Sequence, residues 1–497
     1  MTSRERRAYR ECADIGKIGI VGGGVSGLAA AVWLARAGLN VSLFEANAKL
    51  GGCCATTRIG HYTFNDGALH VALPSLLDHA FGRLGLERAA SVPLRPVAAP
   101  QSVRLPDGTT VALWPNREVR VSGPNGEARG AQASEEMERF LERWRPVLRL
   151  FAQDLFLRPF STGRLLRKGW RHVHKLRGTL ALELERQFSD TDVRAALAGM
   201  LLYTGMPARV APVATALGLV AVLEEGLHLP EGGMGAIPDA LTAALHALGG
   251  DIYTNVRVER IEMKDGRACG LRIARHGVQP FDAVISTVSG MITFGSLLDG
   301  RGIPQAMRHK ASHAPLSHKA LAVQLGLANV IDEDSHSMGV LPLMDEQHKL
   351  FLPSDGLPRW ISYTVPTVTL PGLAAAGGSI VEMFPPIDQA WPVDRWTNET
   401  KEAVAQEAIE ALARSHPLDI AARRVSGPRD YRDGMHLFNG AVYGLSPGAP
   451  AGAQFPHRTP VEGLFQAGQT TYPGFGIAPA MMSGILAAEA LVASVRS

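Results

Sequence analysis

Three glycines near the start of the chain follow a short apolar segment in the pattern G-x-G-x-x-G. The apolar segment, residues 17–21, has the composition of a buried β-strand. In a strand–turn–helix unit, the first glycine permits a tight turn, the second lets the backbone approach a diphosphate, and the third lets the helix pack closely on the strand. The pattern therefore predicts a dinucleotide-binding α/β unit whose helix N-terminus meets the phosphates. The residues predicted for this phosphate site are Gly22, Gly24, Val25, Ser26 and Gly27.

The residues after these glycines continue the same unit. Residues 28–37 are rich in alanine and predict a helix, and Gly38 suits its C-terminal cap. Residues 40–44 predict a second buried strand that ends at Glu45, which follows the first glycine by 23 residues. An acid at this place can accept hydrogen bonds from a ribose and argues against a phosphorylated ribose, but it does not distinguish NAD from FAD. Residues 18–35 are uncharged and long enough for a marginal membrane span, yet their five glycines favour the buried strand, turn and helix.

The composition excludes several other classes of protein. A chain of 497 residues is too long for one compact core, so we expect at least two domains. The 46% hydrophobic and 20% charged residues indicate an ordered globular protein, and a net charge of +3 does not suggest a polyanion binder. The cysteines match no metal-ligand spacing, so we predict no metal site and a reduced, cytoplasmic setting. They are Cys12, Cys53, Cys54 and Cys269.

A second glycine-rich block stands at the far end of the chain, in residues 463–480. Residues 464–467 predict a buried strand, residues 468–476 form a glycine-rich turn, and Pro479 suits the first turn of a helix over 480–495. Such a turn lets the backbone pass close to a flat ring. A helix N-terminus aimed at a flavin would stabilise negative charge on the ring.

Several further segments carry a resemblance to a known group. They are a second glycine turn at 46–52, the segment 61–68, Gly232-Gly233-Met234, the strand-like runs 255–261 and 281–286, and the motif 439–444. With the C-terminal block, they resemble the phytoene desaturase, carotenoid isomerase and retinol saturase flavoproteins, within the wider family that includes monoamine oxidases. The resemblance implies an α/β fold of the two-dinucleotide-binding-domain type: a Rossmann-type FAD-binding domain with an inserted α+β substrate domain.

The resemblance also implies FAD as the cofactor, and no covalent-flavin signature is present, so we expect non-covalent binding. Where relatives often carry a base after the second glycine turn, this chain has Cys53, so a charge contact to the diphosphate is either missing or supplied by Arg58. Gln469 stands where some relatives carry an acid. Beyond the first turn, the implied FAD-binding residues are Glu45, Ala46, Gly51, Gly52, Arg58, Gly67, Ala68, Val258, Gly468, Gln469, Gly476 and Ile477.

In this group the FAD-binding domain is assembled from separated segments. The matching pieces here are 14–90, 225–310 and 425–497, which leaves 91–224 and 311–424 for the substrate domain. Within the predicted substrate domain, residues 143–177 contain ten Lys or Arg and one acid, a local charge of +9, interleaved with apolar residues. This composition suits either a membrane-interface segment or a solvated basic face over core residues. No nucleic-acid-binding module accompanies it, so we do not expect nucleic acid as a partner.

The sequence constrains the type of reaction less than it constrains the identity of the cofactor. Relatives desaturate, saturate or isomerise hydrophobic polyenes and isoprenoids, and the sequence does not select among the three. Asn439, Tyr443 and Phe475 are candidates to line the pocket, either as reacting groups or as packing around the ring. The histidines are scattered without a partner acid and predict no acid–base pair. Those considered are His70, His228, His313 and His318.

Three rival interpretations remain. The same fold serves oxidases of amines or amino acids. It also resembles the prenyl-protein escort proteins, which bind without FAD, although the intact C-terminal glycine block argues against these. A nicotinamide-only dehydrogenase is disfavoured by the same block. We therefore predict a cytoplasmic enzyme with a hydrophobic small-molecule substrate, either soluble or peripherally bound to a membrane, of undetermined oligomeric state.

Overall fold

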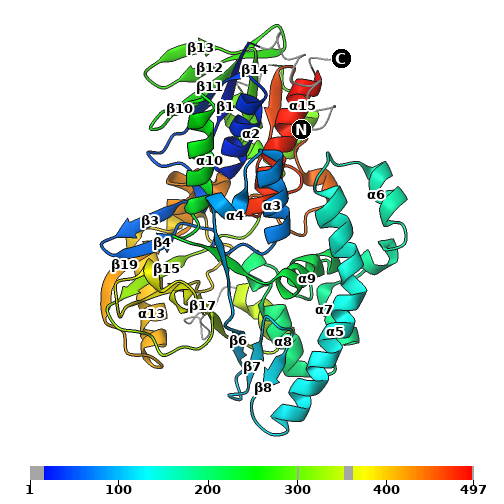
Figure 1. Cartoon of the computed structure of the whole chain (residues 1–497), viewed down its shortest axis with the longest axis vertical. Helices are drawn as coiled ribbons and strands as arrows, with labels where there is room; N and C mark the ends of the chain where they lie inside the picture. Colours follow the sequence, from blue (N-terminus) through cyan, green and yellow to red (C-terminus); the bar gives the residue numbers. More distant parts are fainter. Residues whose placement is uncertain (1–15, 299–301, 352–361, 495–497) are drawn as a thin grey trace.

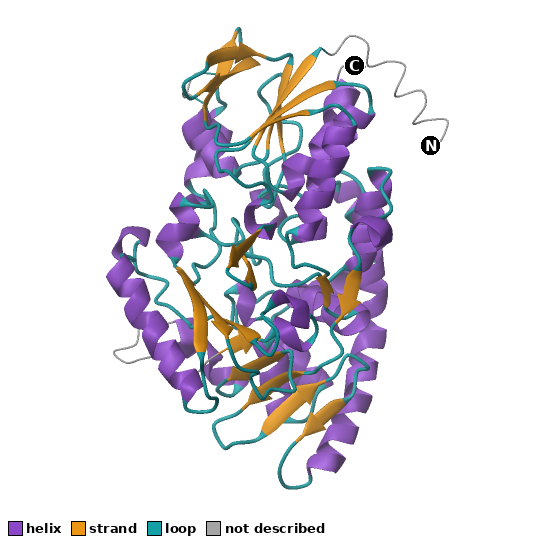
Figure 2. Cartoon of the chain, turned by 60° about the vertical axis from the view of Figure 1, so that its left-hand side comes forward, coloured by secondary structure: helices purple, strands orange, loops and turns teal. Residues whose placement is uncertain are grey.

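Two sheets of different construction organise the chain, one near each end of its long axis (Figures 1 and 2). The computed structural model describes residues 16–298, 302–351 and 362–494. The first sheet is parallel and the second is mainly antiparallel. A three-stranded sheet lies beside the first, and two short strand pairs lie between the two large sheets. These pairs are β3 (Thr56–Ile59) with β4 (Tyr62–Asn65), and β5 (Leu94–Pro96) with β9 (His228–Pro230).

The parallel sheet collects strands from the start, middle and end of the chain. Its order is β10 (Asp251–Tyr253), β2 (Asn40–Phe44), β1 (Lys17–Val21), β14 (Ala283–Ser286) and β20 (Leu464–Gln466). The predicted strands at 17–21 and 40–44 are confirmed. The final strand, predicted over 464–467, ends one residue earlier, at Gln466. Buried runs on both faces explain their apolar composition.

Two helices pack together on one face of this sheet: α2 (Val25–Arg36), which starts earlier than predicted, and α15 (Ile477–Ser494). A Cβ added to Gly484 would lie 2.1 Å from the carbonyl oxygen of Ser26, so the two helices touch through backbone. α15 is long and apolar enough to cross a membrane by composition, but 61% of it is buried inside the protein. α3 (Pro74–Arg83), α4 (Arg88–Ser91) and α10 (Ala236–Ala247) complete this end.

The three-stranded sheet beside the parallel sheet consists of β11 (Val258–Lys264), β12 (Arg267–Ile273) and β13 (Gly277–Pro280). The second large sheet has the order β19 (Ile420–Ser426), β15 (Ala322–Leu327), β18 (Ser379–Met383), β17 (Ser362–Thr364), β16 (Ser337–Val340), β6 (Gln101–Arg104), β7 (Thr110–Leu113) and β8 (Val119–Val121). β19 straddles the predicted boundary at residue 425, and the division into two domains stays a prediction.

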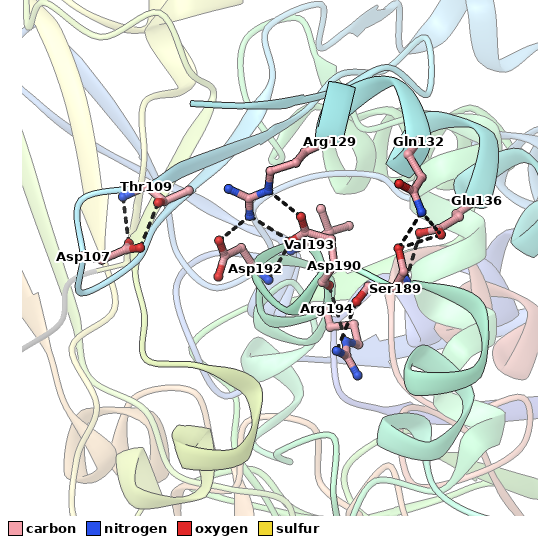
Figure 3. Close-up of polar contacts among 10 residues, drawn as sticks. All are labelled: Asp107, Thr109, Arg129, Gln132, Glu136, Ser189, Asp190, Asp192, Val193 and Arg194. Carbon is pink, nitrogen blue, oxygen red and sulfur yellow. Dashed lines mark hydrogen bonds and ion pairs between the residues drawn. The ribbon is translucent and has the colours of Figure 1, made fainter. Parts of the chain in front are cut away.

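Helices surround the second sheet. They are α5 (Gly126–Leu150), α7 (Leu180–Gln187), α8 (Thr191–Gly199), α9 (Ala216–Glu225) and α13 (Asn398–Ala413). α6 (Thr162–Gly169) lies beside the end of α5, away from this sheet, while α11 (Gly290–Ile292), α12 (Gln305–Ser312) and α14 (Pro428–Asp433) lie in the connections. An ion cluster fastens α5 to the start of α8 (Figure 3). Arg129 contacts Asp190 at 2.7 Å and Asp192 at 2.5 Å, and Asp190 also caps α8 through the amides of Asp192 and Val193. The acids therefore hold both the helix end and the neighbouring helix.

Candidate functional site

The first glycine turn leaves the N-terminus of α2 open. Gly22 has a φ of 102°, and a Cβ on Gly27 would lie 2.0 Å from the Gly22 carbonyl oxygen, so a side chain at residue 27 would clash with the turn. Gly24 is the N-cap and offers no side-chain oxygen, and the first turn of the helix contains no acid. The amide groups at this helix end are therefore left for an anion.

The hydroxyl of Ser26, in the same helical turn, is a second indication that a ligand binds here. Its hydroxyl is buried and has no hydrogen-bond partner among the residues that the structure describes. Buried hydroxyls are normally paired. A phosphate oxygen would accept this hydrogen bond, so the residues of the turn fit a diphosphate.

The carboxylate of Glu45 is fixed at the end of β2. Oε2 accepts a hydrogen bond from the amide of Gly23 at 2.7 Å, and Oε1 accepts one from the amide of Asn47 at 2.8 Å. The carbonyl of Glu45 accepts from Val256, which brings the start of β11 and Val258 to the same place. A carboxylate held in this way keeps lone pairs that can accept from ribose hydroxyls.

The second glycine turn lies directly on the first. The amide of Gly51 donates to the carbonyl of Gly23 at 2.8 Å, and Gly51 has a φ of 107°. A Cβ on Gly52 would lie 3.4 Å from the Cα of Gly24, so the two backbones pass closely. The amide of Ala68 donates to the carbonyl of Cys53 at 2.7 Å, which adds the segment after β4 to the same wall.

The C-terminal block meets these turns from the other side. The amide of Ala467 donates to the carbonyl of Ser286 at 2.9 Å, so β20 extends the sheet beside β14. Gly468 has a φ of 101°, and its amide donates to Ser483 of α15. α15 begins at Ile477 with no acid in its first turn. Two helix N-termini, those of α2 and α15, therefore border one space and favour negative charge in it.

That space is a cavity of about 1050 Å³, large enough for a dinucleotide and part of a further molecule. It brings together eighteen of the twenty residues predicted for the site. They are Gly22, Gly24, Val25, Ser26, Glu45, Ala46, Gly51, Gly52, Gly67, Ala68, Val258, Asn439, Tyr443, Gly468, Gln469, Phe475, Gly476 and Ile477.

Two predicted residues do not line the cavity. Gly27 lies against the Gly22 carbonyl and serves the packing of the turn. Arg58 is exposed on the β3–β4 hairpin, where its Nε donates to the carbonyl of Gly60 at 3.0 Å. In this arrangement the Arg58 guanidinium lies along the hairpin and does not line the cavity, and its contact with the diphosphate stays a prediction.

Cys53 and Cys54 are free thiols beside the second glycine turn. Burial raises the pKa of Cys53 to about 11, and Asp66 adds to the effect. Burial also raises the pKa of Cys54. Because the thiolate is the reactive form, these thiols suit packing better than redox chemistry.

Beyond the glycine turns, the cavity continues into an apolar chamber between the second sheet and the helices over it. Its walls include Leu148 of α5, Leu219 of α9, and Met200, Leu201, Leu227 and Leu341. Glu45 is the one acid among the described residues that line the whole cavity, and its carboxylate is held at the first glycine turn. A chamber of this composition suits a long hydrophobic molecule.

Comparisons with known proteins agree with this geometry. The model of the family "flavin containing amine oxidoreductase" matches residues 25–492. The chain belongs to this family. It is 25% identical to a zeta-carotene-forming phytoene desaturase of Myxococcus xanthus over 96% of this chain and 94% of that one. It is 24% identical to a 4,4'-diapolycopene oxygenase of Methylomonas over 97% and 99% of the two chains.

Solved structures share the fold. An oxidoreductase from Methanosarcina mazei matches with a TM-score of 0.64 at 18% identity, over 97% of this chain and 99% of that one. Cyclohexylamine oxidase from Brevibacterium oxydans matches with a TM-score of 0.62 at 16% identity, over 97% and 100%. The predicted fold class is confirmed, and the protein is an FAD-dependent oxidoreductase. The escort-protein and nicotinamide-only interpretations are thereby set aside.

Several cavity residues belong to no spacing pattern and could not be predicted from the sequence. Thr287 donates to the carbonyl of Val21 at 2.9 Å and braces the first turn. Arg257 and His436 lie beside Glu45 on the cavity wall. His318 was considered among the scattered histidines, yet it lies 5.6 Å from Tyr443 between ring centroids. Only the fold brings these residues together, since they lie far apart in the chain.

Proposed function

We propose that this flavoenzyme desaturates, saturates or isomerises a hydrophobic polyene, isoprenoid or related secondary metabolite. One observation carries the proposal: the cavity that the glycine turns border runs on into an apolar chamber without an acid among its described lining residues. The phytoene desaturase of Myxococcus xanthus and the diapolycopene oxygenase of Methylomonas, whose names refer to polyenes, support this substrate class.

FAD, which we propose to be bound non-covalently, supplies a hydride acceptor at N5. The chain's own residues bind and orient the two molecules. The glycine turns and the N-terminus of α2 would hold the diphosphate, and Glu45 the ribose. The N-terminus of α15 would favour negative charge on the flavin edge. Asn439, Tyr443 and Phe475 would border the ring where the chamber begins. The leucine and methionine walls would exclude water from the reacting carbons.

An amine oxidase is the second candidate, because solved structures with this fold include putrescine oxidase and cyclohexylamine oxidase. A cationic amine is normally stabilised by a nearby carboxylate. The described chamber walls carry no acid, and Lys319 lies among them, so the geometry favours the uncharged substrate.

The two functions can be separated with the purified holoprotein. Anaerobic incubation with a carotenoid panel that includes phytoene should bleach the flavin absorbance near ~450 nm for a desaturase, whereas a saturase should restore this absorbance to pre-reduced flavin. Isomerisation would change the geometry of the polyene with no net flavin reduction, and chromatography would detect it. Peroxide release on an amine panel, with no change in any polyene, would contradict the proposal. Release of flavin into the supernatant after acid precipitation tests non-covalent binding.

We also propose that the enzyme is cytoplasmic and binds membranes peripherally through residues 158–171. The structure divides the basic segment 143–177 into two parts. The end of α5 belongs to the core: Trp144 is fully buried, and Arg143 and Arg145 pair with Glu183 at 2.9 Å and Glu224 at 2.7 Å. The part around α6 instead exposes large apolar side chains beside bases. Phe160 is 44% exposed, Leu166 56% and Trp170 64%.

The region around α6 projects from the side of the molecule in Figure 1. Phe160 contacts Tyr472 at 5.4 Å between ring centroids, and Tyr472 contacts Phe156, which lines the cavity. A chain of aromatic contacts therefore joins this surface to the wall of the cavity. Exposed aromatic groups beside arginines suit an interface of anionic lipid.

Sedimentation with anionic and neutral vesicles tests this surface. The intact protein should sediment with the anionic vesicles in a salt-sensitive manner, and Arg167→Glu plus Lys168→Glu should abolish the binding. The matched control is Lys264→Glu plus Arg275→Glu, which reverses two exposed charges in the β11–β13 region. Absence of vesicle binding by the intact protein, or equal loss in both double variants, would contradict the proposal.

A further inference from the structure

A small polar cluster interrupts the apolar wall where the chamber meets the C-terminal glycine turn. Tyr443 packs on Phe475 of that turn at 4.6 Å and on His318 at 5.6 Å between ring centroids. Backbone hydrogen bonds hold the two segments together, from Ser317 to Gly444 and from Val442 to His318. The pair therefore lies at the end of the chamber that faces the proposed position of the flavin ring.

The ring of His318 is held in place by a glycine. A Cβ added to Gly205 would lie 2.3 Å from both Cγ and Nδ1 of His318, so no side chain fits there. Nδ1 is buried and makes no hydrogen bond of good geometry with the described residues, although the Thr204 backbone lies close enough to the ring to affect its pKa. His318 also lines the cavity, and Nε2, unlike Nδ1, is not a buried unpaired atom, so we infer that the Nε2 edge of the ring faces the open space.

The protonation of both side chains suits hydrogen bonding rather than charge. Burial lowers the pKa of His318 to about 4, with the Thr204 backbone opposing this in part, so the imidazole is neutral near pH 7. Burial raises the pKa of Tyr443 to about 12, and the nearby Tyr203 adds to this, so its hydroxyl keeps its proton. A neutral imidazole both donates and accepts hydrogen bonds, and a tyrosine hydroxyl donates.

A neighbouring tyrosine in this wall has a hydroxyl with a hydrogen-bond partner. The hydroxyl of Tyr203 lies 2.5 Å from the hydroxyl of Ser362. Tyr443 has no such partner among the described residues: its backbone amide donates to Ser317, and no hydrogen bond of its side chain is present. A buried polar group facing a hydrocarbon would remain unpaired, which costs free energy.

We propose that His318 and Tyr443 form a subsite for an oxygen atom, so that the substrate or product is an isoprenoid or polyene bearing a hydroxyl or carbonyl group near the carbon that reacts. This inference rests on the proposed function. Tyr443 would donate to the oxygen. His318 would accept from a hydroxyl or donate to a carbonyl through Nε2. The subsite would orient the chain in the chamber, because an all-carbon chain has no polar end to fix its register.

Equilibrium binding of two molecules to the holoprotein tests the subsite, with geranylgeraniol compared against the hydrocarbon that lacks only its hydroxyl group. Each is titrated while the flavin absorbance and tryptophan fluorescence are followed. The intact protein should bind the alcohol about tenfold more tightly. Tyr443→Phe and His318→Phe should each reduce this preference severalfold, and His318→Gln should restore part of it because the amide keeps a donor and an acceptor.

Tyr203→Phe is the matched control, since it removes a hydroxyl that Ser362 already satisfies, and it should keep the preference. The flavin spectrum and FAD content report whether each variant has folded. Equal binding of the two molecules by the intact protein overturns the subsite and leaves the proposed function standing. Failure of both molecules to bind overturns the subsite and the proposed function together. A preference that survives both Tyr443→Phe and His318→Phe also overturns the subsite.

Discussion

Close contact between α2 and α15 should control the affinity for FAD, and Gly484→Ala tests this. The added Cβ would lie 2.1 Å from the carbonyl oxygen of Ser26, which is about 1.3 Å short of the 3.4 Å at which ordinary contact begins. The helices must separate, or the side chain must be accommodated under strain that costs about 1–3 kcal/mol. Both helix N-termini border the cavity, so the separation displaces two parts of the cofactor site at once.

If the cofactor-free protein can relax and the FAD complex cannot, this strain appears as about 5- to 150-fold weaker binding. Titration of the cofactor-free protein with FAD, followed by the quenching of flavin fluorescence, measures the effect. Gly82→Ala in α3 is the matched control, because a Cβ there meets nothing within 4 Å and alanine is the better helix former. Wild-type FAD affinity in Gly484→Ala would refute the reasoning, since the contact would then not position the site.

Three further results are expected. Burial raises the pKa of Glu382 to about 7. The native state then holds this proton more tightly than the unfolded chain, so the associated stability is present at low pH and is lost as the pH rises through about 7. Glu382→Gln should reduce the fall of the melting temperature that occurs between about pH 5 and 7. An unchanged fall would mean that other groups cause this pH dependence. Glu45→Gln should weaken FAD binding about tenfold in the same titration, and unchanged affinity would place the ribose elsewhere. Alkylation of Cys53 at pH 8, read by mass spectrometry, should be about 100-fold slower than that of a free thiol, whereas rapid labelling would mean that the thiol is accessible and ionised.

The parts of the fold that the sequence could predict are those where backbone geometry demands particular residues. The first turn requires glycine at residues 22 and 27, one for its positive φ and one for its contact with a carbonyl, and the strands on either side are apolar because both faces are buried. The same reasoning located the C-terminal turn. These positions are constrained locally, so a single sequence is enough to recognise them.

The chamber could not be predicted in this way, because its residues share only hydrophobicity and come together through long-range pairing. β6 lies parallel to β16, with Gln101 opposite Ser337, and nothing near either residue specifies the other. The basic segment shows the same limit. The acid that neutralises Arg143 is Glu183, 40 residues away on another helix, so the sequence left a membrane surface and a packed helix as equal alternatives.

The order of strands in the parallel sheet has a consequence for folding during synthesis. β1 borders β14, and β14 borders β20 at the edge of the sheet, so three neighbouring strands join residues near 20, 285 and 465. A ribosome must release almost the whole chain before the last strand can take its place, and until then one edge of β14 is unpaired. The cofactor cannot be fully enclosed by a truncated product. We therefore expect a product that lacks β20 and α15 to bind FAD more weakly than the whole chain.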